Sequence, residues 1–285
     1  MFLPMPSLAV TVEETTYDGQ IAYRVSNEAA RIVVSPHLGR VVEFGATNGP
    51  NVIWQAPKGE FEAKGYRNVG GDKVWYSPQT TWNWPPDPAW DGSGLRATKL
   101  ADGVRLEGTK GKILPLRLTR EIHLDPYAAK VTFTNAMAND GPKPLNVGLW
   151  QVTQIAAPTE IRLSTFPTAA QPKGYAVLVG GFDRSVATVA PNELRIRLHP
   201  TQAYKYGAKG GDGTLTADVG KFRFTTFSKF SRAGRYADQD SAKQVYTASA
   251  ATGYAELEHL APLERLEPRQ VQIQNVTWRL APLSN

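Results

Sequence analysis

The amino-acid sequence predicts an all-β protein, specifically a large antiparallel β-sandwich. Apolar and polar residues alternate with a period of two in short runs along most of the chain, as in strands with one buried face. Gly, Pro, Asn and Asp separate these runs and are typical of turns. No stretch of ten or more residues combines a helical period with capping residues, so we expect little helix.

The chain organisation indicates one unit rather than several. The 285 residues contain no internal repeat, low-complexity tract or linker, and we expect residues 1–285 to form a single domain. About fifteen short strands exceed an immunoglobulin-sized sandwich, which leaves a propeller, an extended jelly roll or a large two-sheet sandwich. A propeller would show a repeat of about 40–50 residues, and none is present. We therefore favour the large sandwich.

The predicted strands follow one another with clear turn signals. An N-terminal meander is expected from four runs at 9–13, 21–25, 30–34 and 40–44. Runs at 95–100 and 104–107 flank an Ala-Asp-Gly sequence and predict a hairpin. Further strands are expected at 114–124, 130–135, 145–154, 176–179, 193–198, 221–227, 244–247, 254–260 and 271–280.

Residues 68–90 combine aromatic, charged and backbone-constraining residues more densely than any other stretch. Four of the seven tryptophans lie here, namely Trp75, Trp82, Trp84 and Trp90. The Gly70-Gly71 pair permits positive φ or close approach of a ligand. Asp72 and Lys73 follow, and can accept and donate hydrogen bonds to sugar hydroxyls. The tryptophan faces suit the apolar faces of sugar rings; the alternative is that they plug the end of a core.

Arg120 falls in the apolar register of the predicted strand 114–124. Its neighbours in that register include Leu118 and Ile122. An arginine on an apolar face is costly unless it meets a carboxylate or a ligand. Both a structural ion pair and a ligand contact are open at this point.

Two glutamates near the C-terminus are candidates for acid–base chemistry. Glu256 and Glu258 are two residues apart in the predicted strand 254–260 and share one face. That face could be exposed to solvent, or it could line a concave sheet where one glutamate acts as a base.

The positive net charge is local. The chain carries a formal net charge of +6. Residues 195–235 contain nine Lys/Arg against two Asp/Glu, so the net charge of this segment alone is larger than that of the whole chain. Such a segment attracts anions of many kinds, including acidic polysaccharides, phosphosugars and nucleic acid. We expect no nucleic-acid partner, because no recognisable reading element accompanies the charge. No run approaches the roughly 20 apolar residues of a membrane span.

The sequence lacks the residues or motifs that several kinds of catalysis and cofactor binding require. The chain has no cysteine, which excludes disulfides, thiol catalysis and thiolate metal sites. The four histidines are far apart and show no metal-ligand spacing, so we expect no metal, and no nucleotide or nucleophile-elbow motif suggests a cofactor. The N-terminus is not an intact signal peptide. We expect a periplasmic or secreted location, with a cytoplasmic one still open.

The block Gly70-Gly-Asp-Lys-Val-Trp75, followed by Ser77-Pro-Gln79 and Trp82-Asn-Trp84-Pro-Pro-Asp-Pro88, resembles a domain-of-unknown-function family related to galactose mutarotase. Weaker similarities are spread over most of the chain, at 23–40, 133–135, 149–154 and 256–278. The resemblance implies a β-supersandwich fold whose concave sheet binds carbohydrate.

The resemblance also implies a catalytic pair, which this chain matches in part. Aldose 1-epimerases use a histidine acid in a His-Pro-Tyr-Phe type motif and a glutamate base near the C-terminus. Glu256 or Glu258 could take the base position. The single His-Pro pair, His199-Pro200, is followed by Thr-Gln, so the acid partner is not identified.

We therefore expect a sugar cleft and a carbohydrate-binding protein. The ligand would be a mono- or oligosaccharide, neutral or anionic, and any catalysis would be proton transfer of the epimerase (mutarotase-like isomerase) or polysaccharide lyase type at Glu256 or Glu258. The expected substrate-binding residues are Asp72, Lys73, Trp75, Gln79, Trp82, Trp84, Arg120, Trp150, Gln154 and Lys205. The alternative is a non-catalytic cell-envelope module that holds anionic polysaccharide through the basic segment 195–235.

Overall fold

A computed structural model describes residues 10–57, 62–63 and 66–283, and these form two large antiparallel sheets. The N-terminal segment considered for a signal peptide lies outside the described residues, as does the first residue of the predicted strand 9–13. The eleven-stranded sheet has the order β1 (Thr11–Tyr17), β2 (Gln20–Ser26), β3 (Ala30–Ser35), β4 (Arg40–Ala46), β7 (Asp72–Ser77), β12 (Leu145–Ala156), β21 (Tyr254–Leu260), β20 (Lys243–Thr247), β17 (Tyr204–Ala208) and β14 (Ala176–Val179), with β22 (Glu264–Leu266) also paired to β12.

The second sheet has ten strands. Their order is β15 (Ala187–Ala190), β16 (Glu193–Ile196), β13 (Glu160–Ser164), β18 (Thr214–Val219), β19 (Phe222–Ser228), β23 (Val271–Pro282), β11 (Lys130–Asn139), β10 (Leu116–Leu124), β9 (Gly103–Lys110) and β8 (Arg96–Lys99). The remaining elements are short: the hairpin β5 (Glu62–Ala63) and β6 (Tyr66–Arg67), the 3-10 turn η1 (Gln79–Thr81) and the helical turn α1 (Ala237–Asp240). The predicted all-β sandwich is confirmed, including the hairpin of β8 and β9.

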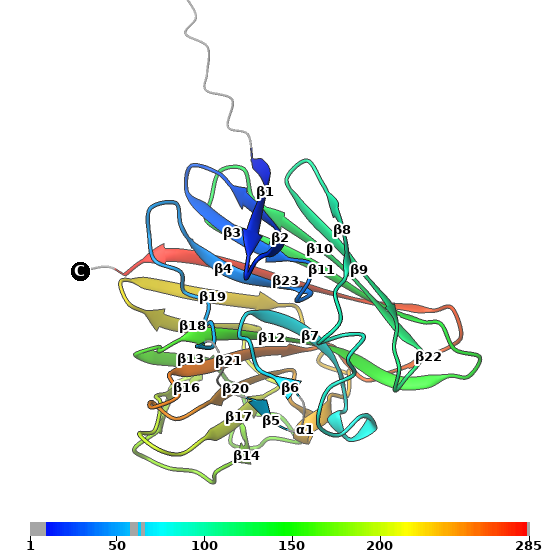
Figure 1. The fold of residues 1–285 in the computed structure, drawn as a ribbon. Helices are drawn as coiled ribbons and strands as arrows, with labels where there is room; N and C mark the ends of the chain where they lie inside the picture. The colour runs from blue at the N-terminus through cyan, green and yellow to red at the C-terminus, as the bar shows by residue number, and fades with distance from the viewer. Residues whose placement is uncertain (1–9, 58–61, 64–65, 284–285) are drawn as a thin grey trace, which may run out of the picture.

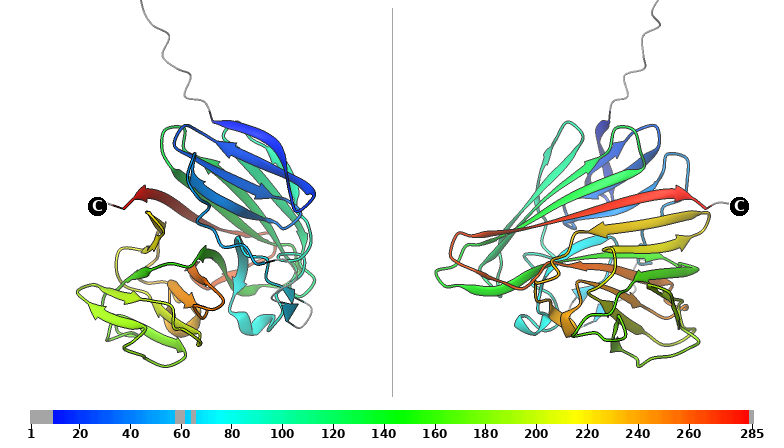
Figure 2. Two further views of the ribbon diagram at one scale, coloured as in Figure 1. Left: turned by 60° about the vertical axis from the view of Figure 1, so that its left-hand side comes forward. Right: turned by 180° about the vertical axis from the view of Figure 1, so that it is seen from behind.

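The two sheets face one another across an apolar core. In Figures 1 and 2 the N-terminal strands β1–β4, drawn in blue, lie over the green strands β9–β11 of the other sheet. Phe44 of β4 contacts Phe224 of β19 and Trp278 of β23, with ring centroids 5.9 and 5.7 Å apart. Trp278 is fully buried and also packs on Phe133 of β11 at 4.5 Å. Aromatic residues from both sheets therefore fill one continuous core.

The Gly70-Gly71 pair introduces β7 with the backbone geometry that only glycine adopts easily. Both residues have positive φ, 87° and 84°. A Cβ atom on Gly70 would lie 2.2 Å from the carbonyl oxygen of Trp54, and one on Gly71 would lie 2.7 Å from that of Val41. The pair thus lets the chain pass between two backbone segments on its way into the sheet.

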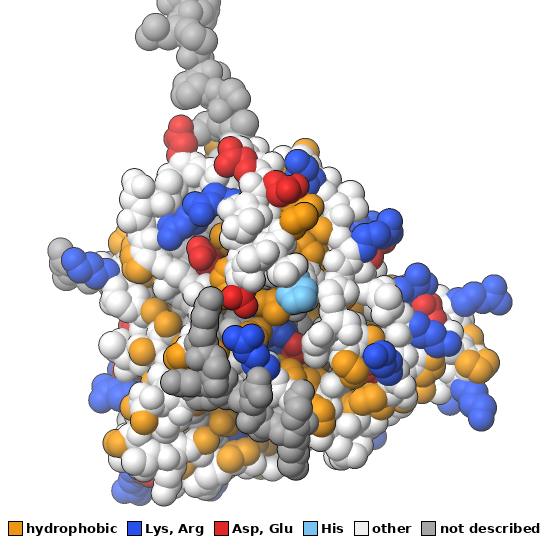
Figure 3. All heavy atoms as spheres, viewed as in Figure 1, with side chains coloured by type: hydrophobic (Ala, Val, Ile, Leu, Met, Phe, Trp, Pro, Cys, Tyr) orange, Lys and Arg blue, Asp and Glu red, His pale blue; other side chains and the backbone are white. Residues whose placement is uncertain are grey.

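The basic segment 195–235 is largely compensated in space. Five of its nine Lys/Arg form ion pairs with carboxylates, often from other strands, namely Arg195–Glu193, Arg197–Glu160, Lys205–Glu258, Lys209–Asp240 and Arg223–Asp218. On the face seen in Figure 3, Lys and Arg side chains are scattered rather than gathered into one patch. Among the described residues, no helix is long and apolar enough to cross a membrane.

Candidate functional site

A pocket of about 440 Å³ lies on the eleven-stranded sheet, over β7, β12, β21, β20 and β17. Cross-strand register brings its residues together: Trp75 pairs with Trp150, and Tyr246 pairs with both Glu256 and Lys205. Because side chains alternate between the faces of a strand, these residues share one face and their sequence neighbours the other. The pocket is lined by Tyr66, Asn68, Trp75, Gln79, Trp84, Trp150, Val179, Lys205, Tyr246, Tyr254 and Glu256.

Aromatic rings form the wall of the pocket. Trp75 meets Trp150 edge to face with centroids 5.2 Å apart, and meets Trp84 at 6.0 Å. Tyr66 contacts Trp84 at 4.9 Å in the same geometry. Edge-to-face contacts of this kind are favourable beyond the area they bury. Trp84 is 37% exposed and so offers its ring at the rim of the pocket.

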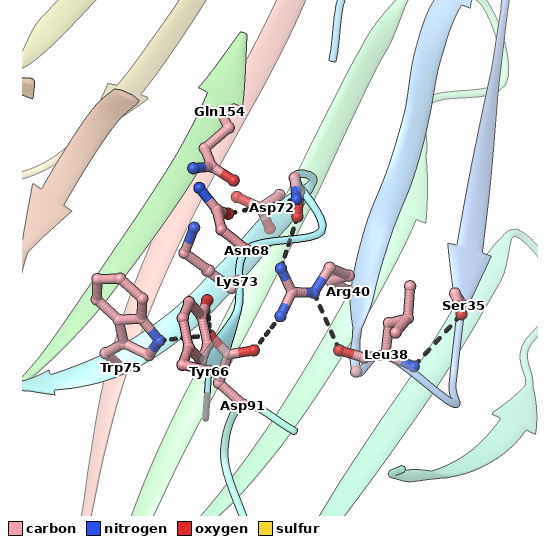
Figure 4. Close-up of polar contacts among 12 residues, drawn as sticks. Ser35, Leu38, Arg40, Tyr66, Asn68, Asp72, Lys73, Trp75, Asp91 and Gln154 are labelled. Atoms are coloured by element: carbon pink, nitrogen blue, oxygen red, sulfur yellow. Dashed lines mark hydrogen bonds and ion pairs between the residues drawn. The ribbon is translucent and has the colours of Figure 1, made fainter. Parts of the chain in front are cut away.

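A buried ion pair holds this wall in position. Figure 4 shows Arg40 lying between Asp91 and the carbonyl oxygens of Leu38 and of Gly70, with the latter bonds 3.1 and 2.6 Å long. The other oxygen of Asp91 accepts hydrogen bonds from the Tyr66 hydroxyl and the Trp75 indole, both at 2.8 Å. Asp91 therefore fixes two pocket rings by their polar atoms while Arg40 balances its charge.

Two lysine–glutamate pairs form the polar side of the pocket. Lys73 Nζ lies 3.6 Å from a Glu256 oxygen and 4.9 Å from the centre of the Trp75 ring. Lys205 Nζ lies 2.9 Å from a Glu258 oxygen and 4.8 Å from the centre of the Trp150 ring. Each ammonium thus contacts a carboxylate and an aromatic face at once. Glu256 reaches the pocket, whereas Glu258 is completely buried beneath it.

Burial changes the titration of these groups. It raises the pKa of Glu258 to about 7; the nearby ammonium of Lys205 lowers that pKa and the charge of Glu256 raises it. Burial also lowers the pKa of Lys73, against the opposing influence of Glu256. Shifts of this kind, next to a pocket, are typical of functional sites.

Comparison with known proteins gives matches at the level of structure. Neither a protein-family model nor a curated protein matches the sequence. A galactose mutarotase-like protein from Clostridium acetobutylicum matches with a TM-score of 0.64 and 11% identity, over 96% of this chain and 99% of that chain. A galactose mutarotase related enzyme from Lactobacillus acidophilus matches with a TM-score of 0.60 and 10% identity, over 93% and 98%. The fold is galactose mutarotase-like.

The same fold occurs inside a longer protein. A TPR-domain containing protein from Parabacteroides distasonis matches with a TM-score of 0.63 and 12% identity over 93% of this chain, and this chain spans 48% of that one. At these identities the likeness establishes the fold alone. The resemblance inferred from the Gly-Gly-Asp-Lys-Val-Trp block is thus confirmed as a fold relationship.

Within this mutarotase-like fold, Asp72 points from β7 into the core, on the opposite face of the sheet from the pocket, and Arg120 meets it there from β10 of the ten-stranded sheet. Their side chains are fully buried and form an ion pair with each other. Asp72 also accepts hydrogen bonds from Gln151 and Thr153 at 2.8 and 2.7 Å. Of the two alternatives for Arg120, the geometry matches the structural ion pair, and Asp72 belongs to the same core network rather than to the pocket.

The structure brings most other candidates together. Six expected residues line the pocket: Trp75, Gln79, Trp84, Trp150, Lys205 and Glu256. Four more are packed directly behind it: Lys73, Gln154, Glu258 and Trp82. Sequence reasoning missed five lining residues: Tyr66, Asn68, Val179, Tyr246 and Tyr254. Tyr254 lies in the same strand as Glu256, on the same face, and could have been found from strand alternation; the others join the pocket through tertiary contacts.

The histidine acid that the resemblance implies, for which the sequence offered no candidate, has no counterpart in the described lining of the pocket. Its lining, as far as the chain is described, contains no histidine. Among the described residues no cluster of three or more His, Asp or Glu side chains could hold a metal. The groups able to exchange a proton with a bound molecule are therefore Glu256, Lys205 and the tyrosines.

Proposed function

We propose that this protein binds a sugar in the aromatic pocket of its eleven-stranded sheet. The observation that carries the proposal is the juxtaposition of three tryptophans with one carboxylate and one ammonium around a single pocket. The exposed ring of Trp84 offers a flat apolar surface for the C–H face of a pyranose, and the largely buried rings of Trp75 and Trp150 line the pocket beside it. The volume of the pocket, about 440 Å³, falls within the range of volumes of small-molecule binding sites. The mutarotase-like fold adds support.

Glu256 is the group best placed to transfer a proton. It lines the pocket, and Gln154 and Lys73 hold its carboxylate from behind, with the Gln154 bond 2.9 Å long. It would accept a proton from the anomeric hydroxyl in epimerisation, or from C5–H in a lyase reaction. Glu258, the second candidate base, is covered by Lys205 and Trp150 and cannot reach a ligand without their displacement.

The alternative of an anionic polysaccharide bound through residues 195–235 has less support. Paired charges lose most of their attraction for a third partner, and four of the nine cations of this segment are paired away from the pocket. A fifth, Lys205, lines the aromatic pocket instead.

Calorimetric titration with neutral and uronic mono- and oligosaccharides tests sugar binding. We expect the Trp84→Ala variant to bind about tenfold more weakly, because it loses one stacking surface. The matched control is Tyr127→Ala, which removes another exposed aromatic ring, 72% accessible, outside the pocket. Absence of heat with every sugar, or an equal loss in both variants, would contradict the proposal.

Turnover separates binding from catalysis. Polarimetry of α- and β-anomers and absorbance detection of unsaturated lyase products cover the two proton-transfer reactions. We expect Glu256→Gln to keep sugar affinity and to lose turnover. If wild-type protein binds a sugar and converts none by either reaction, the catalytic half of the proposal is wrong and the binding half stands.

A further inference from the structure

The fully buried carboxyl of Glu258 is satisfied on one oxygen only. Its Oε2 atom accepts hydrogen bonds from Trp150 Nε1 at 2.8 Å and from Lys205 Nζ at 2.9 Å. Its Oε1 atom has no hydrogen-bond partner among the described residues. A buried oxygen with negative charge and no donor is costly, whereas a protonated oxygen needs only an acceptor.

The side chain of Gln244 carries an oxygen that can serve as that acceptor. It lies directly opposite Glu258 in the β20–β21 pairing, where side chains are close neighbours. Gln244 is also fully buried, and its Nε2 donates to Asp238 at 2.9 Å. Since a carboxylate only accepts, the amide must present its NH₂ group to Asp238. Its oxygen then has no donor in the described chain.

An O–H group on Glu258 satisfies both lone oxygens at once. Gln154 also carries an oxygen without a partner among the described residues. In the β12–β21 pairing, however, Gln154 lies opposite Glu256, and Val152 lies opposite Glu258. Gln244 is therefore the closer acceptor in register. Among the described residues, one proton on Glu258 provides partners for two of these three buried oxygens, those of Glu258 and Gln244, and leaves that of Gln154 as it is.

We propose that Glu258 carries a proton donated to Gln244, so that Lys205 faces the pocket as an uncompensated cation and selects a sugar that bears a carboxylate. This inference rests on the proposed sugar-binding function. With Glu258 neutral, the charges at the pocket are the ammonium groups of Lys73 and Lys205 and the carboxylate of Glu256. The pocket then has one positive charge in excess, which favours an anionic ligand.

Burial outweighs the titratable groups around Glu258, of which Lys205 favours the ionised carboxyl and Glu256 favours the protonated one. Lys205 approaches from β17, Lys73 from β7, Tyr246 from β20 and Glu256 from β21 itself, and Asp238 lies beyond Gln244. The pKa of Glu258, raised to about 7 by burial, keeps the proton in place under mildly acidic conditions. Above that pH the carboxyl ionises and pairs with Lys205, and the excess charge disappears.

Glu258→Gln is the diagnostic variant because an amide reproduces the protonated carboxyl. Its oxygen accepts from Trp150 and Lys205, and its NH₂ group donates to Gln244. The folded protein holds the Glu258 proton more tightly than an unfolded chain, with a pKa of about 7 against 4.5. The stabilisation is therefore full below pH 4.5 and is lost as the pH rises through 7. We expect the melting temperature of wild type to fall over this interval relative to that of Glu258→Gln.

Infrared spectroscopy detects the proton independently of any ligand. The difference spectrum between wild type and Glu258→Gln, at a pH of about 6, is expected to contain the C=O band of a carboxylic acid, and that band is expected to vanish at a pH of about 8. The matched control is Glu256→Gln, whose difference spectrum should show an ionised carboxylate. Absence of the acid band at the lower pH would overturn the proposal.

Calorimetry with matched sugars tests the selectivity. The probes are glucose against glucuronate and galactose against galacturonate, which differ in the carboxylate alone. We expect wild type to prefer the uronate about tenfold or more at a pH of about 6 and to lose preference at about 8. Glu258→Gln should keep the preference at both pH values, and Lys205→Met should abolish it.

The outcomes are distinguishable. If hexose and uronate bind equally well to wild type at both pH values, sugar binding stands and the selectivity inferred here is wrong. If no sugar binds, the proposed function is wrong, and the infrared band still decides where the proton lies.

Discussion

Two adjacent residues in β7, Asp72 and Lys73, point to opposite faces of the sheet and have different roles. Asp72 is directed into the core, where Arg120, Gln151 and Thr153 satisfy its carboxylate. Lys73 is directed to the pocket side, where it contacts Glu256 and Trp75. The sequence analysis assigned both residues to one sugar site because they are adjacent in the chain. Strand parity would have separated them.

The core role of Asp72 is testable by Asp72→Asn. The change leaves Arg120 buried without a counter-charge, and we expect a loss of about 3–5 kcal/mol in the free energy of unfolding. Urea denaturation measures it. The control is Glu107→Gln, which weakens the surface pairs with Arg96 and Arg105 and should cost at most about 1 kcal/mol. Equal losses in the two variants would argue against a structural ion pair.

At the scale of the element, the entry into β7 depends on two glycines in the left-handed region. Gly71 combines a φ of 84° with a backbone oxygen 2.7 Å from any added Cβ. The sequence indicated this need for glycine from the Gly-Gly pair alone. It could not indicate which backbone segments pass close by, since Trp54 and Val41 reach the pair through the tertiary fold.

We expect Gly71→Ala to lower the free energy of unfolding by about 1–3 kcal/mol, because both the backbone conformation and the local space oppose a Cβ atom. Gly19→Ala is the matched control: its φ is 75°, but nothing lies within 4 Å of an added Cβ. Thermal unfolding of the two variants separates steric overlap from backbone strain. A Gly71 variant no less stable than the Gly19 variant would contradict this account.

Alternation in the sequence was sufficient to predict most strands but not their neighbours. The shared face of Glu256 and Glu258 was predictable because parity is a local property. The different depths of the two carboxyls were not, because Trp150 and Lys205 cover Glu258 from other strands. The strands that were not predicted are β5, β6, β7, β13, β15, β17, β18 and β22. Of these, β17 and β18 are short runs among glycines.

At the scale of the whole molecule, one apolar core joins both sheets. Phe44 contributes from the eleven-stranded sheet, and Phe224 and Trp278 contribute from the ten-stranded sheet. The strand orders also interleave early and late segments, since β7 and β21 flank β12. We propose on these grounds that residues 1–285 fold as a single domain.

Equilibrium unfolding tests this domain assignment. Tryptophan fluorescence reports on Trp278 between the sheets and on the pocket cluster, and far-ultraviolet circular dichroism reports on all strands. We expect the two signals to change in one coincident transition, because removing either sheet exposes the shared core. Two separated transitions would show that the sheets, or parts of them, unfold independently.

The alternation along β7, β12 and β21 has a consequence for how the protein can be varied. Pocket-side positions that reach the pocket with a polar side chain, such as Glu256, can be randomised in a library while the core-side positions stay constant. Trp75 and Gln154 share that face but are buried, so they would stay constant as well. A one-residue insertion within β7 would instead exchange the two sets, placing Asp72 toward the ligand and Lys73 in the apolar interior.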